Sequence, residues 1–483
     1  MNIKILTIIL LVALTPPLSS ADWHQFHHNP QRTGNVTGDA PLTDTLLWKT
    51  YLSSNGGGCI EGGASVVDDR VYVSNCPDMD FGHSEILGLY CLNNSTGEIL
   101  WRNPLGGMGG RSTPAISGDR IFVGSCVGDL YCVNASDGET IWHETIETNP
   151  AWWMTGDSPL VYGDKVFING FSDGSLHAFD FGGNNLWNIT TGSTIGWWTS
   201  PAAFGGRIFF AGGDPALYCV NISDHSILWT FNISDKDSIT TTPAIEDGVV
   251  FFATKEMLYA VNMEGGKVWS RDLKGTSSSP AVAHGKVYIG SSDGVFYCFN
   301  ADNGGEVWNL SVDVDIVSSP AIADDTVYFG TNAGDGTVYA LNATDGTVRW
   351  TYDTGNCIMS SPSVSDGTLF IGSDTGYLYA FGTPAKFWQG DTVLLEGETL
   401  DVTANNSGTN YTINRTTALG ALARATEYGG FNITINDSSP AFIDSVADVS
   451  NNVSGGTCWS YWVNYPDDPE PAIGANKFEL NAS

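Results

Sequence analysis

Residues 112–142, STPAISGDRIFVGSCVGDLYCVNASDGETIW, contain four short runs of β-prone residues separated by Gly, Asp and Ser. Ser-Thr-Pro opens the stretch, and an Asp-Gly turn precedes the last run, which ends at Trp142. Runs bounded in this way are strand signals. The same order recurs along most of the chain. A repeat of roughly 40 residues that ends in Trp is typical of stacked four-stranded units.

The closing tryptophan marks each repeat and fixes the number of units. Equivalent tryptophans stand at Trp48, Trp101, Trp142, Trp187, Trp229, Trp269, Trp308 and Trp350. Three more strand runs follow Trp350 without a closing Trp, whereas Trp48 lies in a lone strand, residues 46–52, ahead of the first unit. We therefore predict an all-β protein, an eight-bladed β-propeller whose N-terminal strand completes the last blade. Such closure removes exposed sheet edges. Each of the eight tryptophans is expected to dock against the neighbouring blade.

The composition agrees with a turn-rich protein and argues against one class of partner. The 483 residues include 57 glycines, and Asp and Glu outnumber Lys and Arg by 53 to 20, for a net charge of -33. An acidic surface repels phosphate backbones, so nucleic acid is a poor partner. In the third strand of the repeat, Cys and Ala alternate at one position (LYCVN against LYAVN). We expect a small buried side chain there.

The first 21 residues resemble a targeting segment. Lys4 precedes the apolar run ILTIILLVAL, and small residues at 19–21 form a cleavage pattern, so we predict a signal peptide over residues 1–21. No later run is long enough to span a membrane. Asn-x-Ser/Thr sites are dense, which favours a secreted or cell-surface glycoprotein of archaeal type. These sites are Asn35, Asn93, Asn94, Asn134, Asn188, Asn221, Asn232, Asn309, Asn342, Asn405, Asn410, Asn414, Asn432, Asn436, Asn452 and Asn481.

Residues 22–382 resemble the pyrroloquinoline-quinone (PQQ) type of propeller repeat, also called quinoprotein-like. The runs NNSTGEILW, NASDGETIW and NATDGTVRW match the docking pattern of that family. The resemblance implies the fold. It leaves function open, because the family includes quinone-dependent dehydrogenases as well as cofactor-free scaffolds such as a bacterial outer-membrane assembly lipoprotein.

The repeat stops at a linker, residues 383–389. Residues 390–483 combine β-prone runs with one helical stretch, TTALGALARATEYGG, at residues 416–430. The runs TALGAL, YWVN and GANKFEL resemble the transcobalamin-like C-terminal domain, a small α+β module. In that family a further strand follows the point where this chain stops, so we expect an incomplete domain.

Residues just before each Ser-Pro or Thr-Pro are expected near the propeller axis, where a pocket would form. Hydroxyl residues dominate there: Ser112, Thr199, Thr241, Ser278, Ser318 and Ser360. Glu61 and Asp157 interrupt this ring with carboxylates, and Arg111 stands beside them. The loops of two units add the aromatic pairs Trp152-Trp153 and Trp197-Trp198. Aromatic side chains beside a few polar groups are typical of a ligand pocket. The alternative is that these tryptophans only plug a wide channel.

Enzymes of the resembled family place an adjacent Cys-Cys pair over the quinone and hold calcium with Asp, Glu and Asn. This chain has no Cys-Cys dipeptide. We therefore predict no catalytic residue, no metal and no cofactor; PQQ with calcium belongs to the alternative reading. Cys59 is expected to pair with Cys357 across the seam of the ring, and Cys76 with Cys126, since exported proteins can keep disulfides. Other pairings, or a thiolate metal site, remain open.

These observations lead to a hypothesis about function. We expect an exported, non-catalytic binding or scaffold protein at the cell surface, which recognises a small ligand or a protein partner through the rim loops of the propeller. Two alternatives stand beside it. One is a PQQ-dependent oxidoreductase, and the other is an envelope-assembly scaffold like the bacterial lipoprotein.

Overall fold

The computed structural model describes residues 5–13, 22–52, 58–77, 87–107, 109–146, 157–170, 174–192, 199–233 and 237–382, and short strands after residue 386. The chain divides into two compact units. One comprises Ser19–Thr383, and the other comprises Met1–Leu18 with Pro384–Ser483.

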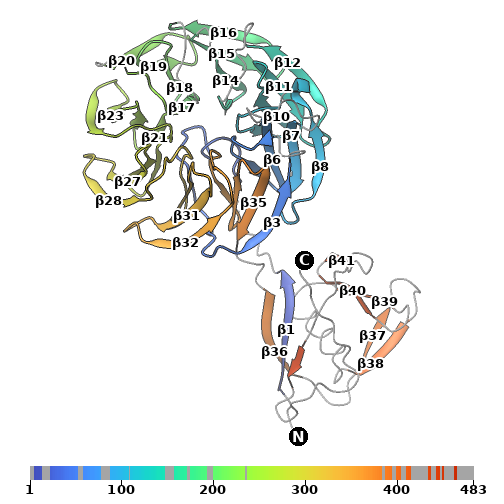
Figure 1. Ribbon diagram of the computed structural model, residues 1–483. Helices are drawn as coiled ribbons and strands as arrows, with labels where there is room; N and C mark the ends of the chain where they lie inside the picture. Colours follow the sequence, from blue (N-terminus) through green and yellow to red (C-terminus); the bar gives the residue numbers. More distant parts are fainter. Residues whose placement is uncertain are drawn as a thin grey trace. The chain divides into compact units, whose positions relative to one another are not determined.

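The larger unit is an eight-bladed propeller of four-stranded antiparallel sheets, as the repeat predicted (Figure 1). Blades 1 to 4 follow in chain order: β5 (Ser65–Val67), β6 (Arg70–Pro77), β7 (Gly88–Asn93) and β8 (Ile99–Asn103); β9 (Ala115–Ser117), β10 (Arg120–Gly124), β11 (Asp129–Asn134) and β12 (Thr140–Thr145); β13 (Leu160–Tyr162), β14 (Lys165–Gly170), β15 (Ser175–Asp180) and β16 (Asn185–Thr190); β17 (Ala202–Phe204), β18 (Arg207–Ala211), β19 (Ala216–Asn221) and β20 (Ile227–Asn232). A short strand, β4 (Gly58–Cys59), adds to blade 1 by pairing with β6.

The last blade closes the ring with the N-terminal strand. Blades 5 to 8 are β21 (Ala244–Glu246), β22 (Val249–Ala253), β23 (Met257–Asn262) and β24 (Lys267–Asp272); β25 (Ala281–Ala283), β26 (Lys286–Gly290), β27 (Val295–Asn300) and β28 (Glu306–Ser311); β29 (Ala321–Ala323), β30 (Thr326–Gly330), β31 (Thr337–Asn342) and β32 (Val348–Asp353); β33 (Ser363–Ser365), β34 (Thr368–Gly372), β35 (Tyr377–Gly382) and β3 (Leu46–Tyr51). Strand β3 runs antiparallel to β35, with Trp48 opposite Ala380. The prediction that the N-terminal strand completes the last blade is confirmed.

The tryptophan of each outer strand lies between two blades. Trp101 and Trp308 show the arrangement: each indole Nε1 donates to a carbonyl of the next blade, at Ala135 and Ala343, over 3.2 and 3.3 Å. The ring also lies on the glycine of that blade's turn, so closely that a Cβ at Gly138 would come within 2.5 Å of it. Within its own blade each Trp stands opposite the buried Cys or Ala of the third strand, for example Cys132 opposite Trp142. The small residue leaves room for the indole.

A lead-in segment, residues 22–36, follows the inner strands around the axis. The second residue of the inner strand in blades 1 to 7 donates its backbone N–H to this segment. The pairs are Val66 to Trp23, Ile116 to His24, Val161 to the side chain of Gln25, Ala203 to Pro30, Ile245 to Gln31, Val282 to Thr33 and Ile322 to Gly34. Tertiary structure makes this segment part of the core, because the inner strands otherwise expose an unpaired edge.

The segment buries its polar side chains as well. Arg32 is fully buried, and its guanidinium donates to the carbonyls of Phe26, Pro201 and Pro159 at 2.7, 3.1 and 3.0 Å. Burial lowers the pKa of Arg32 to about 9 and that of His27 to about 3. His27 is therefore neutral at physiological pH. The charge of Arg32 is stabilised by hydrogen bonds to carbonyl oxygens and not by a carboxylate of the described residues.

Many Asn-x-Ser/Thr sites lie in the turns before the outer strands. There Asn134 Oδ1 accepts from the backbone N–H of Ser136 at 2.8 Å, and Asn342 does the same for Thr344. Asn300 accepts from Asp302 at the same place in blade 6 without forming such a site. Turn formation thus gives these asparagines a structural role, and glycosylation stays a prediction.

The smaller unit contains only short strands among its described residues. Strand β1 (Ile5–Ala13) pairs with β36 (Phe387–Val393) and β42 (Trp462–Asn464); β37 (Thr399–Thr403) pairs with β38 (Asn410–Asn414); β39 (Ile433–Asn436), β40 (Phe442–Val446) and β41 (Val449–Ser450) form a third sheet. The predicted helix at residues 416–430 lies outside the described residues, so the transcobalamin-like assignment stays a prediction, as does the signal peptide. No helix within the described residues has the length and apolar character to cross a membrane.

Candidate functional site

Hydroxyl groups join the blades around the axis. The Ser or Thr that precedes the proline of each unit accepts the backbone N–H of the equivalent residue in the preceding blade. The donor and acceptor pairs are Gly63 to Thr113, Thr113 to Ser158, Ser158 to Ser200, Ser200 to Thr242, Thr242 to Ser279, Ser279 to Ser319 and Ser319 to Ser361, at 2.8 to 3.1 Å. We call this series the hydroxyl ladder. It spans seven junctions and stops between blades 8 and 1, where Gly63 has no hydroxyl.

The residues that face the axis are shifted by one position from those predicted. The residues one position earlier, predicted to face the axis, are fully buried and bonded to backbone; Ser318 Oγ, for example, donates to the carbonyl of Ser360 at 2.8 Å. Side chains alternate along extended backbone. The ladder residues therefore line the axial cavity together with the residues two positions before them.

The axial cavity is a partly open hollow with about 500 Å³ of empty space, a figure that includes the part open to solvent. Its lining is Phe26, Glu61, Gly62, Gly63, Arg111, Thr113, Ser158, Ser200, Ser277, Ser279, Val317, Ser319, Met359 and Ser361. Phe26 belongs to the lead-in segment, so that segment forms part of the cavity wall. Hydroxyl groups dominate the rest, and among the described lining residues Arg111 is the single cation and Glu61 the single carboxylate.

Glu61 and Arg111 form an ion pair on adjacent blades. Arg111 Nε lies 3.2 Å from Glu61 Oε2, and the two side chains are only 3% and 10% exposed. Burial by itself would lower the pKa of Arg111, but the acidic groups around it, Cys76 and Glu61 foremost, raise it above its ordinary value. The guanidinium therefore stays charged. A buried pair of this kind adds little net stability, and removing one partner is strongly destabilising.

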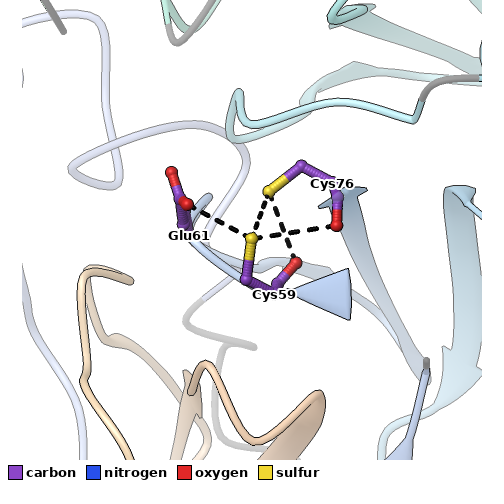
Figure 2. Close-up of side chains that lie close together, drawn as sticks. All are labelled: Cys59, Glu61 and Cys76. Carbon is purple, nitrogen blue, oxygen red and sulfur yellow. Dashed lines mark hydrogen bonds between the residues drawn. The ribbon is translucent and has the colours of Figure 1, made fainter. Parts of the chain in front are cut away.

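Three buried cysteines, Cys59, Cys76 and Cys126, cluster beside this ion pair. Cys59 Sγ lies 2.7 Å from Cys76 Sγ and 3.2 Å from Glu61 Oε1. Figure 2 shows the three side chains pointing toward one another. Cys59 and Cys76 face each other directly across β4 and β6. The hydrogen bond with Cys76 is the main cause of the raised pKa of Cys59, and burial of the thiol raises this pKa further. Burial also raises the pKa of Cys126. Both thiols are therefore protonated at neutral pH.

The remaining predicted site residues divide into two groups. Trp152, Trp153, Trp197 and Trp198 lie outside the described residues. Asp157 is buried but does not line the axial cavity, because it occupies the position of Ser112 in the repeat, one residue out of step with Glu61 and Arg111. Of the predicted polar groups, the structure brings Glu61 and Arg111 together.

The predicted disulfides, Cys59 with Cys357 and Cys76 with Cys126, stay predictions. In the structure Cys59 faces Cys76, and Cys126 lies in the same buried cluster. The short strand β4, which was not predicted from the sequence, pairs with β6 and turns Cys59 back onto its own blade.

The described lining of the axial cavity does not fit PQQ with calcium. Calcium takes six to eight oxygen ligands, with carboxylates prominent among them, and the cavity offers one carboxylate that is already bonded to Arg111. The quinone itself carries carboxylates, and the one cation of the lining is held by Glu61. No reaction step through a quinone follows from these residues.

Comparisons with known proteins point to one family. A family model described as outer membrane protein assembly factor BamB matches residues 32–196, 172–264 and 254–411. The BamB protein of Yersinia pestis is 24% identical over 325 residues, which cover 63% of this chain and 79% of that protein. The crystal structure of BamB from Moraxella catarrhalis superposes with a TM-score of 0.57 at 18% identity, over 71% of this chain and 99% of that chain.

Quinohemoprotein alcohol dehydrogenase from Comamonas testosteroni is also similar, over a shorter part of its sequence. It is 26% identical over 107 residues, which cover 19% of this chain and 15% of that enzyme. Its crystal structure gives a TM-score of 0.62 at 15% identity, over 78% of this chain and 83% of that chain. Similarity at this identity shows a shared fold. The PQQ-type propeller repeat inferred from the sequence is thus confirmed.

These relatives overturn the main functional hypothesis. A non-catalytic cell-surface protein that recognises ligands or partners through rim loops was expected, and that prediction is wrong. The relatives are assembly factors and quinoprotein dehydrogenases, which were the two alternatives. The aromatic pairs on which the predicted rim site depended lie outside the described residues. The hydroxyl ladder was not predicted, although the sequence carries one signal for it: a hydroxyl before almost every proline of the repeat.

Proposed function

Because the chain belongs to the family of outer membrane protein assembly factor BamB, we propose that it is an assembly scaffold of the cell envelope that binds protein partners. The family match over most of the propeller carries this proposal. The predicted leader, residues 1–21, would serve export to that compartment. The poor fit of the axial cavity to a quinone and calcium also favours the scaffold over the oxidoreductase.

The closed ring suits a scaffold. Each blade is fixed to the next by an indole at the outside, and seven of the eight junctions carry a ladder bond at the axis. A rigid body presents its outer surface in one arrangement, so a partner does not have to order it on binding. The expected contacts therefore lie on the outer strands.

Two outer strands expose adjacent apolar side chains. On β8, Ile99 and Leu100 are 42% and 45% exposed, and on β20, Ile227 and Leu228 are 48% and 44% exposed. Single exposed apolar residues are ordinary, whereas adjacent ones add to a contact surface. We place partner contacts at these two pairs.

The test is depletion of the protein in its own cells, followed by complementation. Depletion should leave envelope proteins unassembled, and the wild-type gene should restore them. The double variant Ile227→Ser/Leu228→Ser should fold normally and fail to restore assembly, whereas the matched Val268→Ser, on the outer strand of blade 5, should succeed.

Two results would count against the scaffold. One is an unchanged set of assembled envelope proteins after depletion. The other is dye reduction by the purified chain when it is supplied with PQQ, calcium and an alcohol, which would establish the oxidoreductase instead.

A further inference from the structure

We propose that Cys59 and Cys76 form a disulfide that clamps β4 onto blade 1 and holds Glu61 against Arg111. The sulfur atoms lie 2.7 Å apart, and the two residues stand directly opposite each other on antiparallel strands. A disulfide bond measures about 2.05 Å and suits Cα atoms roughly 4.4–6.8 Å apart. Directly opposed residues on antiparallel strands lie about 4.5–5.5 Å apart. Bond formation therefore needs only a small movement of the side chains.

A metal ion fits this pair less well. Cys59, Glu61 and Cys76 offer ligand atoms within 4.8 Å of one another, close enough to share one metal ion, and thiolates favour ions such as zinc. Two thiolates bound to one tetrahedral zinc at about 2.3 Å would lie about 3.8 Å apart. The observed separation is much shorter than that. In addition, the guanidinium of Arg111 already lies on the carboxylate that would complete the site.

The covalent step balances with a protein disulfide as oxidant. A thiolate of one cysteine attacks the disulfide of a thiol–disulfide oxidoreductase, and a mixed disulfide forms. The second cysteine then displaces the oxidoreductase thiol. Cys59 and Cys76 together lose two protons and two electrons, and the oxidoreductase disulfide becomes two thiols. Both cysteines are buried in the finished fold, at 5% and 0% exposure, so this exchange takes place while the chain folds.

The disulfide affects the axial cavity because Cys59 lies close to Glu61 in the chain. Glu61 follows Cys59 by two residues, and its carboxylate forms an ion pair with Arg111, which precedes the first strand of blade 2. Strand β4 has only two residues, so few backbone bonds hold this part of the chain. A covalent tie between β4 and β6 keeps the one described ion pair of the cavity in register. Cys126 remains as a third thiol beside the bond.

The first test is peptide mapping of the full-length protein exported to an oxidising compartment. Thiols are blocked in denaturant without reductant, and the protein is then digested. The Cys59 and Cys76 peptides should appear linked, lighter by two hydrogens than the sum of the reduced peptides, with Cys126 and Cys357 alkylated. Alkylated Cys59 and Cys76, a link from either to Cys126 or Cys357, or one zinc per chain that Cys59→Ser removes would each overturn the proposal.

The second test measures what the bond does. Reductant should lower the Tm of the wild type by about 5 °C. Cys59→Ser should start at the lower Tm and lose its dependence on reductant, while the matched Cys357→Ser keeps the wild-type response. Cys76→Ala serves in place of Cys59→Ser if that variant does not fold. A wild-type Tm that ignores reductant would refute the clamp, and the outcome is independent of whether the protein is an assembly scaffold.

Discussion

The junction between blades 8 and 1 differs from the other seven junctions of the ring. Seven are built alike, with a hydroxyl that precedes a proline and accepts the amide of the blade before. At the eighth, Gly62 and Gly63 replace the hydroxyl pair and the ladder bond is missing, although Ser360 Oγ still donates to the carbonyl of Gly62 at 3.0 Å, as Ser318 Oγ does to that of Ser360. Blade 1 also carries Glu61, Cys59 and Cys76, and Arg111 and Cys126 complete the ion pair and the cysteine cluster across the next junction, between blades 1 and 2. The break in the ladder and the charged and thiol groups therefore lie on the two sides of the same blade.

On the outer rim, a tryptophan lies at every blade junction without a break. The largest predicted effect comes from removing one of these tryptophans. Trp308→Ala should lower the free energy of unfolding by about 3–5 kcal/mol, because it leaves a cavity at a blade junction where the indole is 8% exposed. Thermal and denaturant unfolding measure this loss. Trp308→Phe keeps most of the ring and gives up the hydrogen bond to Ala343, so its loss should be about 1 kcal/mol. Equal losses for the two variants would contradict a docking role.

Acid should destabilise the fold through the buried histidines of the lead-in segment. The buried His27 has a pKa lowered from 6.5 to about 3, so between those values the unfolded chain binds a proton that the folded chain does not. Stability therefore falls as the pH drops below 6.5, by up to about 1.4 kcal/mol per pH unit from this group. Tm measured from pH 7 to pH 5 should show the slope.

His27→Gln is the matched variant for the pH prediction. It should be less stable at pH 7 and should flatten the slope between pH 6.5 and pH 5. His28, whose pKa burial lowers to about 4, will retain part of the slope. A slope that is identical in the variant would place the acid sensitivity elsewhere.

Within the ladder, Ser319→Ala should cost about 1–3 kcal/mol. The hydroxyl accepts the buried amide of Ser279 at 2.9 Å, and the alanine leaves that amide without its acceptor. Ser223→Ala, at an exposed turn on the rim, should change the unfolding free energy by less than about 0.5 kcal/mol. Urea unfolding of the two variants side by side checks the difference, which would vanish if the ladder contributed nothing.

The smallest effect concerns the irregular junction itself. Gly63→Ser supplies the missing hydroxyl opposite Ser361, and one further ladder bond should stabilise the ring by about 0.5–1 kcal/mol. A Cβ at Gly63 would come within 2.9 Å of Thr113 Oγ1 and 3.1 Å of the Ser361 carbonyl, so the neighbours must shift slightly. A large loss in Tm would show that blade 1 requires glycine here, and that this junction cannot be made like the others.

The sequence by itself determined the ring. The spacing of the tryptophans, the hairpin turns and the unpaired strand of Trp48 are local signals, and a repeat multiplies each of them, so eight blades and their closure could be predicted. The position shared by Cys and Ala was predictable for the same reason, since its environment recurs in every unit. The family resemblance was also visible in the repeat. It indicates the fold but does not distinguish among the functions found in the family.

Only the tertiary structure decided what lies at the axis. The lead-in segment has no periodicity, so nothing local shows that Arg32 is buried among carbonyls of two blades. The face to which a strand turns its side chains changes with a shift of one residue, which is why Asp157 was grouped with Glu61 and the ladder was missed. Cys59 meets Cys76 because a two-residue strand folds back on its blade, a contact set by packing and absent from any repeat.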